Sequence, residues 1–117
     1  MADRFSPDWV TRLDHLVRGI RTDQAFVIQQ VVTGATGREE AWYLELGPDG
    51  SRVHGGRAEG ADVTFTQDRA TADAIADGDL SAGAALTAGR LTVRGATARL
   101  TEYREALARI DEALADA

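Results

Sequence analysis

The segment of residues 62–95 constrains the fold of this chain more than any other part of it. Val63 and Phe65 alternate with threonines near its start, and Leu91 and Val93 alternate with polar residues near its end. An apolar residue at every second position is typical of a β-strand that buries one face. We therefore expect two strands of one sheet here, with the residues between them covering that sheet.

The stretch between these two strands is predicted to hold two short helices, each ended by a glycine. Asp68 or Thr66 is placed to cap the first helix, and Ser81 is placed to start the second. Gly78 and Gly89 follow the last turns of the two helices, at the position where a left-handed residue commonly ends a helix. The segment is thus predicted as strand, helix, helix, strand.

The rest of the chain is predicted to add two longer helices and three strands. Apolar residues recur at helical spacing over residues 8–20 and 96–116, which predicts two amphipathic helices. Residues 25–33 are rich in β-branched side chains, and residues 42–46 and 52–54 flank a turn, which predicts a strand and a hairpin. This order of elements predicts an α+β domain with helices layered on a sheet.

The length and composition of the chain fit a single domain that spans residues 1–117. The sequence is 44% hydrophobic and 27% charged, which is ordinary for a globular protein that folds unaided. It contains no cysteine. Disulfide bonds, thiolate nucleophiles and cysteine metal sites are therefore excluded.

The charge of the chain argues against two classes of partner. The formal net charge is −6 at pH 7, whereas binding to nucleic acid or to anionic membranes depends on clustered positive charge. No apolar run of transmembrane length and no signal-peptide pattern are visible. We expect no nucleic-acid partner, no stable membrane insertion and a cytoplasmic location. All 13 basic residues are arginines, a bias typical of GC-rich bacterial genomes.

The segment DVTFTQDRATADAIADGDLSAGAALTAGRLTVRG resembles the signature of the sterol carrier protein type 2 family. That signature joins a strand, a short helix, a Gly-x-Leu junction, an alanine-containing helix and a Gly-x-Leu-x-Val-x-Gly strand. The spacing fits without a gap, and residues 26–50 are compatible with the early strands of the family. The matching residues are Asp62, Val63, Thr64, Gly78, Leu80, Ala84 or Ala85, Gly89, Leu91, Val93 and Gly95.

This resemblance implies a mixed, mostly antiparallel five-stranded sheet with helices packed on one face and an apolar cavity between the layers. Family members bind sterols, fatty acids or other lipids. The resemblance therefore implies non-catalytic binding or transfer of a lipid or other apolar small molecule. Two alternatives remain open: an accessory or cyclase-like enzyme that uses the same cavity, and a protein-interaction module with a packed core. A homodimer or an enzyme partner is compatible with these readings.

The candidate ligand-binding residues are those predicted to face the space between the sheet and the helices. Residues 82–88 are mostly alanine and glycine, so they either leave apolar volume unfilled for a ligand or allow close helix packing. The candidate set is Phe26, Ile28, Gln30, Trp42, Leu44, Phe65, Ile75, Leu86, Leu91, Val93, Leu100, Tyr103 and Leu107.

Gln30 and Tyr103 are the polar members of this set. Strand alternation places Gln30 on the face shared by Phe26 and Ile28, where its amide would contact either a ligand head group or water at the strand end. The hydroxyl of Tyr103 would meet a ligand or a backbone carbonyl, since a buried tyrosine hydroxyl usually has a partner.

No catalytic residue, metal site or cofactor is predicted. His15 and His54 are the two histidines of the sequence, and both are expected to face solvent. Two isolated histidines without cysteine do not build a metal site, and no pattern joins a nucleophile to a base. We therefore expect binding rather than catalysis.

Overall fold

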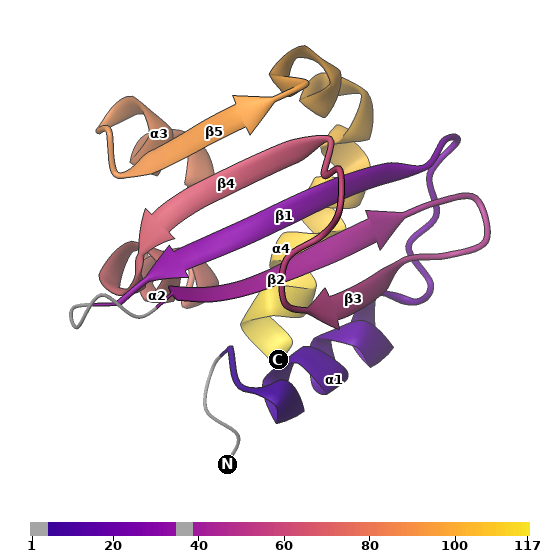
Figure 1. Ribbon diagram of the computed structural model, residues 1–117, viewed down its shortest axis with the longest axis horizontal. Helices are drawn as coiled ribbons and strands as arrows, with labels where there is room; N and C mark the ends of the chain where they lie inside the picture. The colour runs from indigo at the N-terminus through magenta and orange to yellow at the C-terminus, as the bar shows by residue number, and fades with distance from the viewer. Residues whose placement is uncertain (1–4, 35–38) are drawn as a thin grey trace.

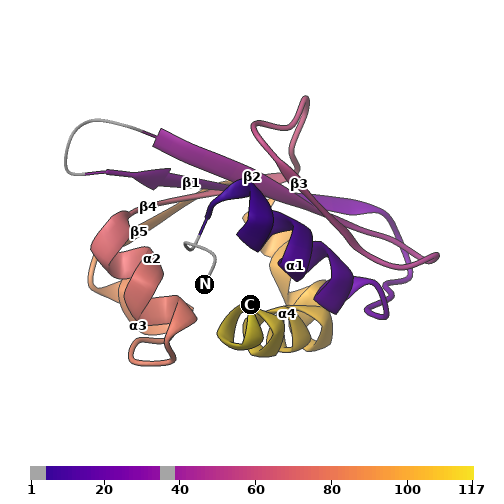
Figure 2. The same ribbon diagram turned by 90° about the horizontal axis from the view of Figure 1, so that it is seen from below.

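A single sheet forms one layer of the protein, and the helices cover one of its faces (Figures 1 and 2). The computed structural model describes residues 5–34 and 39–117. The elements in chain order are α1 (Pro7–Val17), β1 (Phe26–Thr33), β2 (Glu39–Leu46), β3 (Arg52–Gly55), β4 (Val63–Asp68), α2 (Arg69–Ala76), α3 (Ala82–Thr87), β5 (Leu91–Gly95), the 3₁₀ segment η1 (Thr97–Tyr103) and α4 (Arg104–Asp116).

The sheet has five strands in the order β3-β2-β1-β4-β5. β1 and β4 run parallel, and the other neighbouring strands pair antiparallel. The prediction of a mixed, mostly antiparallel five-stranded α+β fold is therefore confirmed. The parallel pair arises because the chain crosses from one edge of the sheet to its middle between β3 and β4.

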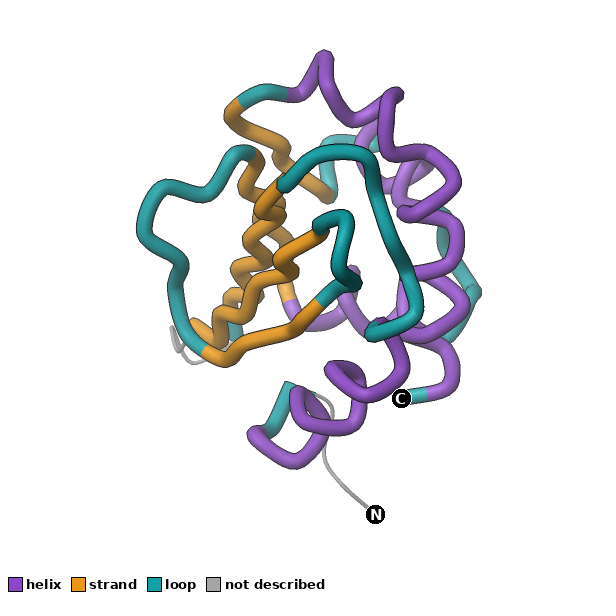
Figure 3. The backbone as a smooth tube through the Cα atoms, turned by 90° about the vertical axis from the view of Figure 1, so that its right-hand side faces the viewer, coloured by secondary structure: helices purple, strands orange, loops and turns teal. Residues whose placement is uncertain are grey.

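That crossing lies on the sheet face opposite the helices, as Figure 3 shows. The Gly56 amide donates to the Ala41 carbonyl at 2.8 Å, and the Asp62 amide donates to the Val27 carbonyl at 2.9 Å. Between these two contacts, the Ala58 amide donates to Gln29 Oε1 at 2.7 Å. These hydrogen bonds hold the connection against β1 and β2, and the connection helps to bury Gln29 on this outer face.

The predicted ends of α2 and α3 are present, and α1 begins with a cap of the same kind. Ser6, Asp68 and Ser81 each accept a hydrogen bond from a backbone amide in the first turn of α1, α2 and α3, respectively. Gly78 and Gly89, just beyond α2 and α3, have φ angles of +81° and +75°. These are left-handed conformations that glycine adopts without steric cost.

Two predicted helices differ in extent from the observed ones. The helix expected over 8–20 ends at Val17, and Ile20 is held in a turn where its carbonyl accepts from Ser51 Oγ at 2.6 Å. The helix expected over 96–116 is divided into η1 and α4. At the end of η1, Tyr103 stacks on Phe26 with ring centroids 4.3 Å apart, a tertiary contact that helical periodicity alone does not reveal.

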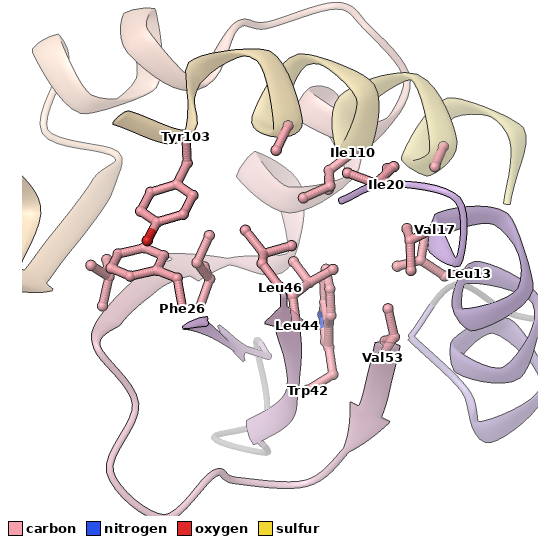
Figure 4. Close-up of a cluster of buried hydrophobic side chains, with 14 of the residues drawn as sticks. Leu13, Val17, Ile20, Phe26, Trp42, Leu44, Leu46, Val53, Tyr103 and Ile110 are labelled. Atoms are coloured by element: carbon pink, nitrogen blue, oxygen red, sulfur yellow. The ribbon is translucent and has the colours of Figure 1, made fainter. Parts of the chain in front are cut away.

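The hydrophobic core lies where α1 and α4 cover the inner face of β1, β2 and β3. Trp9, Leu13 and Val17 of α1 are almost fully buried, and the Trp9 ring meets the Trp42 ring edge-on at 5.3 Å. Figure 4 shows Trp42, Leu44 and Leu46 on the sheet side of this cluster and Ile110 on the α4 side. This half of the layer is closed by large side chains.

Candidate functional site

A pocket of about 240 Å³ lies between the other half of the sheet face and helices α2 and α4. Its residues come from the N-terminal segment, four strands and three helices. They are Phe5, Ile28, Gln30, Trp42, Leu44, Phe65, Gln67, Ala72, Ile75, Ala76, Ala82, Leu91, Leu107, Ile110, Asp111 and Leu114.

The floor of the pocket follows from strand alternation. Ile28 and Gln30 are two residues apart on β1, as are Phe65 and Gln67 on β4, so each pair points to the same side of the sheet. The strands pair in parallel, with Gln30 opposite Phe65. The helix-facing surface therefore presents two apolar positions and two amides side by side.

The roof of the pocket follows from helical spacing. Ala72 and Ala76 are four residues apart on α2 and face the sheet as buried methyl groups. On α4, Leu107, Asp111 and Leu114 continue one face at intervals of four and three. Because the α2 residues are so small, the layer is left unfilled beneath this helix.

The polar atoms of the pocket wall come mainly from Gln30, Gln67 and Asp111. Gln67 Nε2 donates to Gln30 Oε1 at 3.1 Å, which leaves the Gln30 amide hydrogens as donors and Gln67 Oε1 as an acceptor. Trp42 adds a buried Nε1–H that has no hydrogen-bond partner among the described residues. The hydrogen bond to Gln30 thus gives Gln67, which is buried, the partner that a buried polar group requires.

Asp111 stands at the rim of the pocket. The residue is exposed overall, but apolar neighbours displace water from its carboxylate, and this desolvation raises the pKa of Asp111 above its ordinary value. Within the described residues its carboxylate has no hydrogen bond and no ion pair. No described neighbour supplies a positive charge that pairs with this carboxylate.

Eight of the thirteen candidate ligand-binding residues line this pocket. They are Ile28, Gln30, Trp42, Leu44, Phe65, Ile75, Leu91 and Leu107. Their role toward a ligand stays a prediction.

Three further candidates, Leu86, Val93 and Leu100, lie outside the pocket and border a more open hollow of about 390 Å³ beside β5. Leu86 is 51% exposed because α3 sits at the edge of the sheet and has no helix beyond it (Figure 2). Phe65, Ala82 and Leu91 line both the pocket and this hollow. The two spaces are therefore neighbours that share one wall.

The remaining candidates, Phe26 and Tyr103, pack against each other in the core instead of lining the pocket. The Tyr103 hydroxyl accepts a hydrogen bond from Arg99 Nη2 at 3.0 Å, so its protein partner is a guanidinium group and not a backbone carbonyl, while its role toward a ligand stays a prediction. His15 is exposed as predicted, whereas His54 is half-buried because its ring stacks on Tyr43 at 4.9 Å.

Sequence reasoning missed Gln67 and Asp111. The signal for Gln67 was alternation, since it lies two residues after Phe65. The signal for Asp111 was its place four residues after Leu107, on the same helix face.

In the described residues there is no group of three or more His, Cys, Asp or Glu placed to hold a metal. No helix among these residues has the length and apolarity to cross a membrane.

Comparison with known proteins decides the family. The model of the SCP-2 sterol transfer family matches residues 16–108. The chain belongs to this family. The predicted resemblance is therefore confirmed. No curated protein gave a match.

Solved structures of the family share the fold. A crystal structure of sterol carrier protein 2 superimposes with a TM-score of 0.77 at 21% identity, covering 96% of this chain and 97% of that one. A palmitated sterol carrier protein 2-like 2 from Aedes aegypti has a TM-score of 0.64 at 26% identity, with 97% and 95% coverage. Sterol carrier protein 2 from Yarrowia lipolytica, in its apo form, has a TM-score of 0.61 at 21% identity, with 91% and 81% coverage.

Proposed function

We propose that this protein binds and carries a lipid or other apolar small molecule in the pocket between the sheet and helices α2 and α4. The observation that carries the proposal is an apolar space left open inside the layer. Ligand sites are typically apolar concavities with a few placed polar groups. The wall of this pocket has that composition, with Gln30, Gln67 and Asp111 as its polar members.

The size of the pocket favours a flexible chain. Water occupies about 30 Å³ in the liquid, and a methylene group is of similar size, so 240 Å³ corresponds to roughly eight chain carbons. A longer chain would need to pass Phe65, Ala82 and Leu91 into the neighbouring hollow beside β5. An acyl or isoprenoid chain adapts to such a path more readily than a rigid sterol ring system.

The family relationship supports the same class of ligand. The chain shares its family with sterol carrier proteins, and one structural neighbour is described as palmitated. The fold likeness to the neighbours below 25% identity supports the architecture alone. The ligand class proposed here rests on the pocket together with family membership.

The two alternative functions receive less support. An enzyme that moves a proton needs an acid and a base, and Asp111 is the one titratable side chain that lines the pocket within the described residues. An interaction module requires a packed layer, and the open space beneath α2 argues against it. The single domain, the cytoplasmic location and a homodimer or enzyme partner stay predictions.

The first test is native mass spectrometry of the purified protein, followed by denaturing extraction of whatever it carries. We expect a stoichiometric apolar molecule that leaves on unfolding. A protein that is empty and takes up neither alkyl nor sterol probes would contradict the proposal.

The second test fills the pocket from α2. Ala76→Leu adds three carbons, or roughly 90 Å³, to a buried position that lines the pocket. The matched control is Ala70→Leu on the exposed side of the same helix. We expect Ala76→Leu to weaken binding of an alkyl probe at least about tenfold while the protein stays folded, and Ala70→Leu to bind normally. Equal binding by both variants would place the ligand elsewhere.

A further inference from the structure

The described lining of the pocket contains a carboxylate but no cation. Asp111 is the one charged side chain among its described lining residues. Asp111 also borders a smaller hollow toward α3, and the other residues of that hollow are uncharged as well. Among the residues that the structure describes, a ligand whose head group carries a negative charge would therefore find no positive charge at either space.

The helix that carries Asp111 does not supply a counter-charge. The positions three and four residues away on α4 are those that can contact its side chain, and they hold Leu107, Ala108, Leu114 and Ala115. Arg109 is two residues away and so projects from a different side of the helix. Within α4 the carboxylate therefore has no charge partner.

The described residues of the pocket wall opposite α4 supply no counter-charge either. Arg69 places its guanidinium group 4.9 Å from the centre of the Phe5 ring, and Arg69 Nε lies 3.2 Å from Asp73. Arg90 donates to Thr71 at 3.2 Å. Neither arginine lines the pocket, so each serves α2 and its surroundings instead of the ligand space.

An uncharged hydroxyl group meets a different environment. It can donate to Gln67 Oε1 or to the Asp111 carboxylate, and it can accept from the free amide hydrogens of Gln30. A carboxylate can accept from the same amide, but it cannot donate, and it is repelled by Asp111. The polar groups of the wall therefore suit a head group that both donates and accepts.

We propose that the pocket selects an apolar chain that ends in an uncharged, hydroxyl-type head group and discriminates against a carboxylate, with Asp111 as the residue that sets this preference. The inference rests on the proposed lipid-binding function and narrows it to one class of ligand. The desolvation that raises the pKa of Asp111 supports it, because the same loss of water strengthens repulsion between two carboxylates.

The test compares two ligands of equal chain length, 1-decanol and decanoate, at pH 8. Binding is followed by calorimetry and by tryptophan fluorescence, to which Trp42 in the pocket wall contributes. Repulsion between two solvated charges about 4 Å apart corresponds to roughly a fivefold change in Kd, and to more where water is excluded. We expect decanol to bind at least about fivefold more tightly than decanoate.

Decanoate is also the more hydrophilic ligand, so a difference in affinity alone does not isolate the effect of Asp111. The decisive quantity is the ratio of the decanoate Kd to the decanol Kd, and how this ratio changes on substitution. Asp111→Asn should lower the ratio by about fivefold, and Asp111→Arg should make decanoate the tighter ligand. Glu112→Gln is the matched control, since it removes one charge from the neighbouring exposed position of α4, and it should leave the ratio unchanged. Circular dichroism checks that each variant keeps its fold.

A wild-type protein that prefers decanoate would overturn the inference, as would an Asp111→Asn ratio equal to that of the wild type. Both outcomes leave the proposed function standing, because a chain still binds. If neither ligand binds and no molecule co-purifies, the proposed function fails and this inference fails with it.

Discussion

Replacing Asp14 should destabilise the fold far more than its place on the polar side of α1 suggests. Asp14 is only 7% exposed. Its carboxylate accepts from the Val53 amide at 2.8 Å, from Arg52 Nε at 2.9 Å and from Arg18 Nη2 at 3.0 Å. One side chain thus fastens α1 to the edge strand β3.

The magnitude follows from what Asp14→Ala leaves behind. The guanidinium groups of Arg52 and Arg18 are half-exposed and can turn to water, so most of the loss comes from the Val53 amide, which stays buried without an acceptor. An orphaned buried donor costs about 1–3 kcal/mol. For a domain of this length each kcal/mol lowers Tm by about 4 °C, so we expect a decrease of roughly 4–12 °C.

The pH dependence supplies a second readout. Burial alone would raise the pKa of Asp14, but hydrogen bonds from Arg52, Val53 and Arg18 outweigh it and hold the pKa well below its usual value of 3.8. A folded-state pKa that is lowered contributes stability above the unfolded pKa, and this stability is lost as pH falls through the folded pKa. The free-energy difference between wild type and Asp14→Ala should therefore be largest at pH 7 and shrink below about pH 4.

Urea denaturation followed by tryptophan fluorescence, repeated between pH 7 and pH 3, measures both effects. Asp14→Asn keeps an oxygen for the Val53 amide and should lose less stability than Asp14→Ala. Glu112→Gln, at an exposed position of α4, is the control for the loss of a charge. A free energy of unfolding for Asp14→Ala within about 0.5 kcal/mol of wild type, or parallel pH profiles of the two proteins, would show that Asp14 does not hold α1 against β3.

Three further substitutions test the layer and the pocket. Leu91→Arg places an unpaired charge at a position only 4% exposed and should lower the free energy of unfolding, measured by urea denaturation, by at least about 3 kcal/mol. A folded variant that still binds a ligand would contradict the buried position of Leu91 in β5. Ile75→Arg, at a half-buried pocket residue, should keep the fold and abolish uptake of an alkyl probe; unchanged uptake would move the ligand away from α2. Gly95→Ala should lower Tm by several degrees, because the φ angle of Gly95 is +106° and a Cβ there would meet the Asp62 carbonyl oxygen. Gly55→Ala is the control: a Cβ at Gly55 would enter open space, so Tm should change little.

Local sequence patterns predicted the fold correctly where a backbone conformation or a strand face requires a particular type of residue. Gly78 and Gly89 end helices because the chain needs a left-handed residue there. The alternation in β4 and β5 fixes which residues face the helices. These requirements depend on neighbours in sequence, so the sequence expresses them directly.

The sequence does not predict features that depend on contacts between residues far apart along the chain. Asp14 reads as a solvated helix residue, yet it is buried because β3 lies 39 residues away in sequence and over it in space. Gln67 gains its place in the pocket from Gln30, 37 residues earlier. Leu86 reads as a wall residue from its helical pattern, but α3 lies at the sheet edge and leaves it exposed.

The size of the side chains on the covering helices explains why one sheet face has both a closed core and an open pocket. Against β2 and β3 the covering helix α1 presents Trp9, Leu13 and Val17, which fill the layer. Against β1 and β4 the covering helix α2 presents Ala72 and Ala76, which do not. Ile28, Trp42 and Leu44 belong to both regions. A molecule that fills the pocket therefore completes the packing of the core itself, so its binding free energy adds to the stability of the fold.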